Sequence, residues 1–130
     1  MVVSLKQSLS TNLVLKIRLQ NTLPHEIETY LARLPWENRD SMYLILVKES
    51  VIPEPPLKTR LVIDDPSPGR VILGPSQVLE GEVDLSVRFP ELYEILKKQN
   101  VMLFWSYRFE PIRKHPLERM GGFLLLRRTT

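Results

Sequence analysis

Hydrophobic and polar residues alternate along two stretches of this chain. In residues 13–20 every second position is aliphatic, and most of the positions between them are polar. A period of two places the aliphatic side chains on one face of a half-buried strand. Residues 78–87 alternate in the same way, with Glu80, Glu82 and Asp84 opposite the aliphatic positions. We therefore predict a strand over each stretch. For the three carboxylates we favour a solvated outer face over a site for a hard cation or a basic partner.

Shorter apolar runs, separated by proline and glycine turns, predict the remaining strands. These runs occupy residues 42–48, 57–63, 70–73, 101–109 and 123–128. The run over residues 101–109 is apolar on both faces at its start, which predicts a central position in a sheet. We expect its three aromatic residues nearest the end to fill the core, and these are Trp105, Tyr107 and Phe109.

Two further segments concern helices. Residues 25–34 fit either a strand or a short helix, and we favour the strand because Pro35 ends any helix there. A helix is predicted over residues 91–99, where Pro90 suits the first turn and two lysines lie near the negative end of the helix dipole. Seven or eight short strands, about ten residues apart, with this one short helix predict an all-β fold, a β-sandwich.

The order of four segments resembles known sandwich domains. The segments are residues 13–20 running into Asn21, Pro35-Trp36, residues 71–76 (Val-Ile-Leu-Gly-Pro-Ser), and residues 82–86 (Glu-Val-Asp-Leu-Ser) followed by residues 101–107. This order resembles the immunoglobulin-like domain that precedes the catalytic domain of deuterolysin-type metallopeptidases. It is also similar to the small β-sandwich of bacterial intracellular proteinase inhibitors. The resemblance covers about residues 12–109 and implies the fold and a binding role. It carries over no catalytic residue.

Composition and charge limit the class of protein. The 130 residues, of which 43% are apolar and 25% charged, suit a single globular domain over residues 1–130. The formal net charge is +3, and residues 108–130 carry most of the basic excess, which suits a solvated end or an anionic partner. Neither a signal-like stretch nor an apolar run of about 18 residues is visible, so we expect a cytoplasmic protein without a membrane span.

Residues that carry chemistry are few. The chain has no cysteine, and its two histidines, His25 and His115, do not form a His-x-x-x-His pair. Zinc sites need three or four cysteine, histidine or carboxylate ligands, so we expect no metal and no cofactor. The glycines lack the spacing of a phosphate-binding loop, and no Gly-x-Ser-x-Gly elbow is present. We therefore expect a protein that is not an enzyme.

Binding through a surface is the remaining function. A small sandwich without catalytic groups usually acts through end loops or an edge strand. We predict a non-enzymatic protein-binding module, an inhibitor or immunity-type protein that blocks a partner protein. The predicted contact residues come from the loops over residues 35–41 and 110–121, and they are Trp36, Arg39, Arg113, Lys114, His115 and Arg119. Trp36 either stands exposed as an anchor or plugs the end of the sandwich, and we favour the plug.

Two alternatives remain for the partner. The basic segment of residues 108–130 would suit a nucleic-acid-binding accessory protein, because lysine and arginine neutralise phosphates. An exposed edge strand could also pair with a second copy of the chain and give a homodimer.

Overall fold

The computed structural model of this chain describes residues 1–8, 13–37, 39–50, 54–60 and 68–129. Two antiparallel three-stranded sheets hold most of the strand residues in the described structure. The first sheet has the order β1-β2-β6, with β1 at Val2–Gln7, β2 at Val14–Gln20 and β6 at Val78–Asp84. The second has the order β4-β7-β8, with β4 at Tyr43–Lys48, β7 at Val101–Tyr107 and β8 at Met120–Leu126. The predicted all-β class is confirmed.

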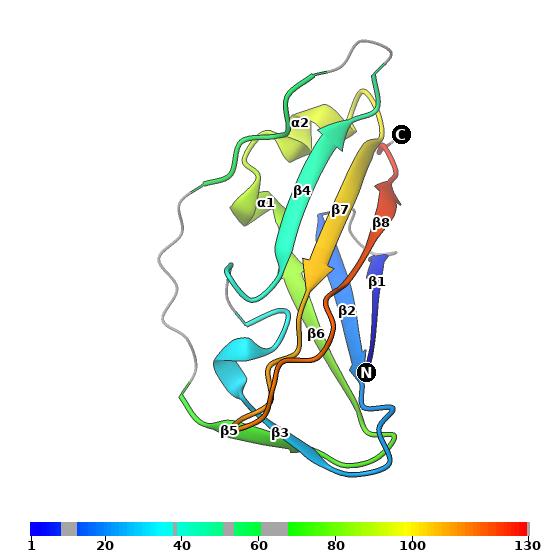
Figure 1. Cartoon of the computed structure of the whole chain (residues 1–130). Helices are drawn as coiled ribbons and strands as arrows, with labels where there is room; N and C mark the ends of the chain where they lie inside the picture. The colour runs from blue at the N-terminus through cyan, green and yellow to red at the C-terminus, as the bar shows by residue number, and fades with distance from the viewer. Residues whose placement is uncertain (9–12, 38, 51–53, 61–67, 130) are drawn as a thin grey trace.

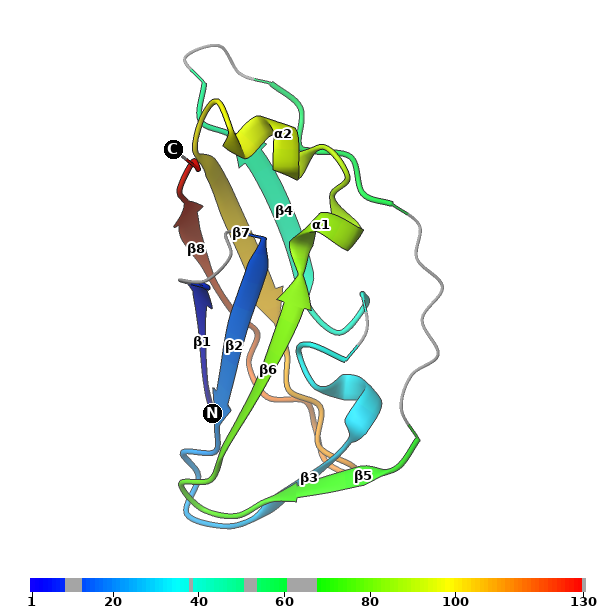
Figure 2. The same ribbon diagram turned by 180° about the vertical axis from the view of Figure 1, so that it is seen from behind.

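The two sheets face each other. Figure 1 shows β4, β7 and β8 in front of β1, β2 and β6, and Figure 2 shows the same pair from behind. A two-stranded ribbon of β3 (Ile27–Tyr30) and β5 (Arg70–Leu73) lies across one end in both views. The two sheets and the ribbon together give the chain one hydrophobic core.

The inward side chains of both sheets form the core. In β2 the predicted alternation is confirmed, because Leu15, Ile17 and Leu19 are buried and the lysine and arginine between them are exposed. Leu103 and Tyr107 of β7 are buried from the opposite side. Burial of apolar surface, at about 25 cal/mol per Å², is the main force that holds such sheets together. The predicted central position of β7 in its sheet is also confirmed.

The strand predicted over residues 78–87 is shorter than expected. It ends at Asp84, and Leu85–Arg88 form a short helix, α1. The Asp84 carboxylate accepts hydrogen bonds from the backbone N–H of Ser86 at 2.9 Å and from its hydroxyl at 2.6 Å. Aspartate is a favoured N-cap because it satisfies a free N–H of the first helical turn. The predicted inward position of Val87 is therefore wrong, and this side chain is exposed.

Other boundaries also differ from the prediction. The helix expected over residues 91–99 is present as α2 but covers only Leu92–Leu96. The segment 25–34 contains strand β3 and then a single 3-10 turn, η1, at Leu31–Arg33. Residues 57–60 of the predicted strand 57–63 are not in a strand, although Leu57 is buried and its N–H donates to the Leu46 carbonyl at 2.8 Å. Residues 61–63 lie outside the described residues.

The connection between β7 and β8 is fastened to β3 and η1. The backbone N–H of Ile112 donates to the Glu28 carbonyl at 2.9 Å, and the Thr29 hydroxyl donates to the Glu110 carbonyl at 2.8 Å. The Tyr107 hydroxyl donates to the Arg33 carbonyl at 2.7 Å. Burial raises the pKa of this hydroxyl, and the Glu110 charge raises it further. This segment, although polar, is therefore held against the ribbon by both backbone and side-chain bonds.

Candidate functional site

Three large apolar side chains lie in one row across the outer surface of β4-β7-β8. Ile45 pairs with Phe104, and Phe104 pairs with Phe123, so the row crosses all three strands. These side chains are 50%, 46% and 71% exposed. Tyr43 on β4 is 60% exposed on the same face. Single exposed apolar residues are ordinary on protein surfaces, whereas a contiguous group of them marks a place of interaction.

We call the nine outward positions of these strands the apolar face. They are Tyr43, Ile45, Val47, Met102, Phe104, Ser106, Gly121, Phe123 and Leu125. None of the nine is charged. Strands of this length, spaced about 4.8 Å apart, give a footprint about 23 Å long and 10–14 Å wide. The inward neighbours of these residues fill the core, so the fold itself does not require the apolar face to be apolar.

Arginine side chains stand at both ends of the apolar face. Tyr107 pairs with Met120, so Arg108 and Arg119, which flank that pair, lie at the same end of the sheet. Arg119 lies over the Tyr43 ring, 5.5 Å from its centroid, and donates to the Ser106 hydroxyl at 3.0 Å. A cation over an aromatic face is attracted by the ring and holds both groups in place.

The opposite end of the apolar face lies where β8 ends. Arg127 and Arg128 come directly after this strand, and both are exposed. The acidic residues nearest the two ends in the chain are Glu49, which follows β4, and Glu118, which precedes Arg119. Asp40 and Glu110 line a hollow together with Arg108, but they lie 4.0 Å and 3.6 Å from the side chains of Arg39 and Arg33. With these two carboxylates offset, four arginines against two glutamates leave the rim of the apolar face with an excess of positive charge.

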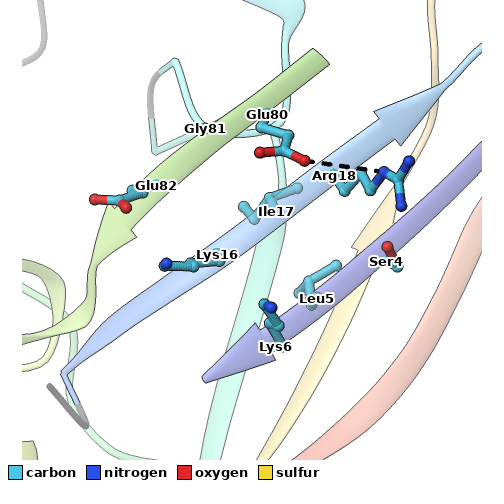
Figure 3. A pocket seen from close by; sticks show the side chains of 9 residues that line it. All are labelled: Ser4, Leu5, Lys6, Lys16, Ile17, Arg18, Glu80, Gly81 and Glu82. Carbon is cyan, nitrogen blue, oxygen red and sulfur yellow. Dashed lines mark ion pairs between the residues drawn. The ribbon is translucent and has the colours of Figure 1, made fainter. Parts of the chain in front are cut away.

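The outer surface of the other sheet is different. A hollow of about 490 Å³ there is lined by Ser4, Leu5, Lys6, Lys16, Ile17, Arg18, Glu80, Gly81 and Glu82 (Figure 3). Lys16 is opposite Glu82 and Arg18 is opposite Glu80, with 4.0 Å between the Arg18 Nε and Glu80 Oε1 atoms. Exposed pairs of this kind contribute little to stability. The prediction that Glu80, Glu82 and Asp84 form a solvated face agrees with the exposure of all three residues.

Trp36, one of the predicted contact residues, packs against the hydrophobic core. Its half-buried ring lies directly on Gly81 of β6, where any Cβ atom would overlap it. The plug that we favoured from the sequence agrees with this position better than a free-standing anchor does. Arg39, from the same loop, lies 4.0 Å from a carboxylate oxygen of Asp40.

The other predicted contact residues are divided between two places. Arg113, Lys114 and His115 are exposed on the connection between β7 and β8, just after the bond from Ile112 to β3. Arg113 has a φ of 59°, in the left-handed region. Of the six predicted residues, Arg119 is the one with a contact to the apolar face.

Sequence reasoning missed the aromatic residues that give the apolar face its character. Met102 and Phe104 lie opposite the core residues of β7, and this pattern predicted a strand covered on both faces. In the structure Met102 is half-buried and Phe104 is exposed. A strand with one core face and one unpartnered apolar face has the same sequence pattern as a strand between two layers. The apolar pattern on both faces of β7 was therefore visible in the sequence, but it fitted a strand covered on both faces as well as a strand with one exposed apolar face.

No protein-family model matches this chain, and no curated protein matches it. Within the described ranges, histidine, aspartate and glutamate nowhere gather in a group of three that could hold a metal ion. No helix in the described part of the chain has the length and apolar character needed to cross a lipid bilayer. The apolar face is therefore the feature of the described structure that best supports a function.

Proposed function

We propose that this protein is a non-enzymatic binding module that docks onto another protein through the apolar face. The observation that carries the proposal is the row of Ile45, Phe104 and Phe123, which crosses the sheet and is about half exposed or more. Water solvates such a row poorly, and covering it with an apolar surface is favourable. Aromatic residues and arginines are also the types that contribute most to binding energy at protein interfaces.

In the form that we favour, docking blocks the partner, as an inhibitor or an immunity protein does. Two features support this form. The segment order resembles that of the intracellular proteinase inhibitors, and the strands hold the apolar face rigidly, so little conformational entropy is lost on binding. In this proposal the partner contacts the residues of the apolar face together with Arg119, and not the loop residues expected from the sequence.

A photo-cross-linking experiment tests the proposal. A benzoyl-phenylalanine residue is placed at position 123, on the apolar face, in the cells that make the protein. A matched control carries it at position 18, on the charged outer surface of the other sheet. We expect one covalent adduct with another protein from position 123 and none from position 18. The captured partner is then purified, and its affinity for the unmodified chain is measured by calorimetry.

Substitutions on the two outer surfaces complete the test. Phe123→Ser should weaken binding of the purified partner at least ten-fold, because a central aromatic contact is lost. Lys16→Ala, on the other sheet, should leave the affinity unchanged. If position 123 gives no adduct, or if Phe123→Ser and Lys16→Ala bind equally well, the apolar face is not the docking surface.

One observation favours a second candidate function. Exposed aromatic rings beside arginines also form the platforms on which single-stranded nucleic acids stack, and Tyr43, Phe104 and Phe123 have this arrangement. Against it, much of the same face consists of apolar residues without rings, which offer bases no stacking surface, and these are Ile45, Val47, Met102 and Leu125. Fluorescence anisotropy with a labelled single-stranded RNA or DNA at ~50 mM salt decides, because phosphate contacts are strongest at low salt. Absence of binding there would remove this candidate.

A further inference from the structure

We infer that the partner segment seated on the apolar face is an amphipathic α-helix of about four turns, with acidic residues towards both ends. This inference rests on the proposed function and adds the shape and charge of the occupant. Three observations carry it: the dimensions of the apolar face, the bonds already made at the two edges of its sheet, and the arginines at its ends.

The dimensions of the apolar face suit a helix. The outer strands β4 and β8 lie about 10 Å apart on either side of β7, since neighbouring strands are separated by about 4.8 Å. A helix with its side chains is also about 10 Å across. The strands are six or seven residues long, which corresponds to about 20–23 Å and to about 14–15 residues of helix.

The edges of this sheet already carry contacts from the same chain. Beside β4, the N–H of Leu57 donates to the Leu46 carbonyl at 2.8 Å. Beyond β8, the Gln7 side chain accepts from the Arg127 N–H at 3.0 Å and donates to the Arg127 carbonyl at 3.5 Å. A partner strand added along β4 would have to compete with the first bond, and a strand that extended past the end of β8 would have to compete with the bonds to Gln7. The flat face is open, so a helix lying on it meets no such competition.

The charge at the ends of the apolar face selects an acidic partner. Arg108 and Arg119 stand at one end, and Arg127 and Arg128 at the other. A second copy of this chain, stacked face to face with its strands aligned, would bring arginines against arginines at both ends. Carboxylates at the two ends of a helix would instead pair with the arginines.

Two synthetic peptides form the test. Both are stapled 16-residue helices with the same leucine-rich apolar stripe. One carries glutamates near both ends, and the other carries lysines there. Their binding to the full chain is measured by fluorescence anisotropy at low and high salt. We expect the acidic peptide to bind at least ten-fold more tightly at low salt and to lose most of that advantage at high salt, because salt screens exposed charges.

Charge reversal sharpens the test. The double variant Arg119→Glu and Arg127→Glu should reverse the preference, so that the lysine peptide binds more tightly. Lys6→Glu with Arg18→Glu makes the same change of net charge on the other sheet and should keep the original preference. Circular dichroism checks that both variants remain folded.

The outcomes separate this inference from the proposed function. Equal binding of both peptides, abolished by Phe123→Ser, overturns the acidic helix while the docking surface stands. Failure of both peptides also overturns the helix, and the adduct from position 123 then decides the proposed function by itself. Binding to phosphatidylserine vesicles in preference to the acidic peptide overturns the inference as well, since it assigns the arginines to a lipid surface.

Discussion

The two sheets of this protein have similar inner faces and opposite outer faces. Inside, both present buried aliphatic residues, such as Leu15 on β2 and Leu103 on β7. Outside, β1-β2-β6 carries lysine, arginine and glutamate in facing pairs, whereas β4-β7-β8 carries uncharged residues, most of them apolar. The fold constrains only the inner positions, because they alone must exclude water. The outer positions are free to vary, so their difference reports what each surface does.

The largest expected effect separates the inner from the outer face of a single strand. Leu103→Ala should lower the free energy of unfolding by about 2–5 kcal/mol, because it leaves a cavity in the core. Phe104→Ala, on the next residue, should change it by less than about 1 kcal/mol, because its side chain is half exposed. Urea unfolding of both variants measures the difference. Equal losses would show that the apolar face stabilises the fold and would weaken its assignment to binding.

A second prediction compares a tryptophan–glycine contact in each sheet. A methyl group at Gly81 would overlap the Trp36 ring, so Gly81→Ala should cost about 1–3 kcal/mol. At Gly122 the added Cβ would lie 3.0 Å from Nε1 of Trp105, which is a tight contact but not the overlap that occurs at Gly81. Gly122→Ala should therefore cost less than Gly81→Ala in thermal unfolding. The reverse order would mean that Trp105, and not Trp36, is the tightly packed ring.

The smallest effect compares two tyrosines on opposite faces of one sheet. Tyr107→Phe removes a buried donor from the Arg33 carbonyl and should cost about 1 kcal/mol at neutral pH. Tyr43→Phe, at an exposed ring, should cost nothing measurable. Chemical denaturation at pH 7 measures both values.

The pH dependence of the same variant sharpens this comparison. Burial raises the pKa of Tyr107 above its usual value of about 10, and the Glu110 charge adds to the rise. Above pH 10 the unfolded chain therefore loses this proton while the folded chain keeps it. The contribution of Tyr107 to the free energy of unfolding is therefore complete below pH 10, and it is lost as the pH rises towards the raised pKa. Tyr107→Phe should fall less steeply above pH 10 than the parent protein, and identical slopes would contradict the assignment.

The inner face of the fold could be predicted from the sequence, because burial leaves a period of two. Leu15, Ile17 and Leu19 are examples, and so are Tyr107, the last residue of β7, and Phe109 just after it. The end of β6 could not be placed in this way. Leu85 continues the alternation and is buried, but it belongs to α1, where the Asp84 cap overrides the strand pattern. A local hydrogen bond thus decided the boundary where hydrophobicity continued across it.

The candidate site was less predictable than the core. Arg119 was chosen for its charge, and it does contact the apolar face, whereas Trp36 was chosen as an aromatic at a strand end and packs on Gly81. Phe104 and Phe123 were not chosen, since an apolar outward residue can be covered by another layer of the same chain. Only the arrangement of all strands in space shows that nothing in the described chain covers them.

The row across the apolar face has a consequence for the timing of biosynthesis. Ile45, Phe104 and Phe123 come from three strands that are far apart in the chain, and β8 is the last strand in chain order. A nascent chain that has left the ribosome only as far as β7 has neither the third ring nor Arg119. Domains synthesised from the N-terminus fold as their segments emerge. Under the proposed function, the docking surface is therefore complete only once β8 has joined its sheet, and a chain truncated before β8 should not dock.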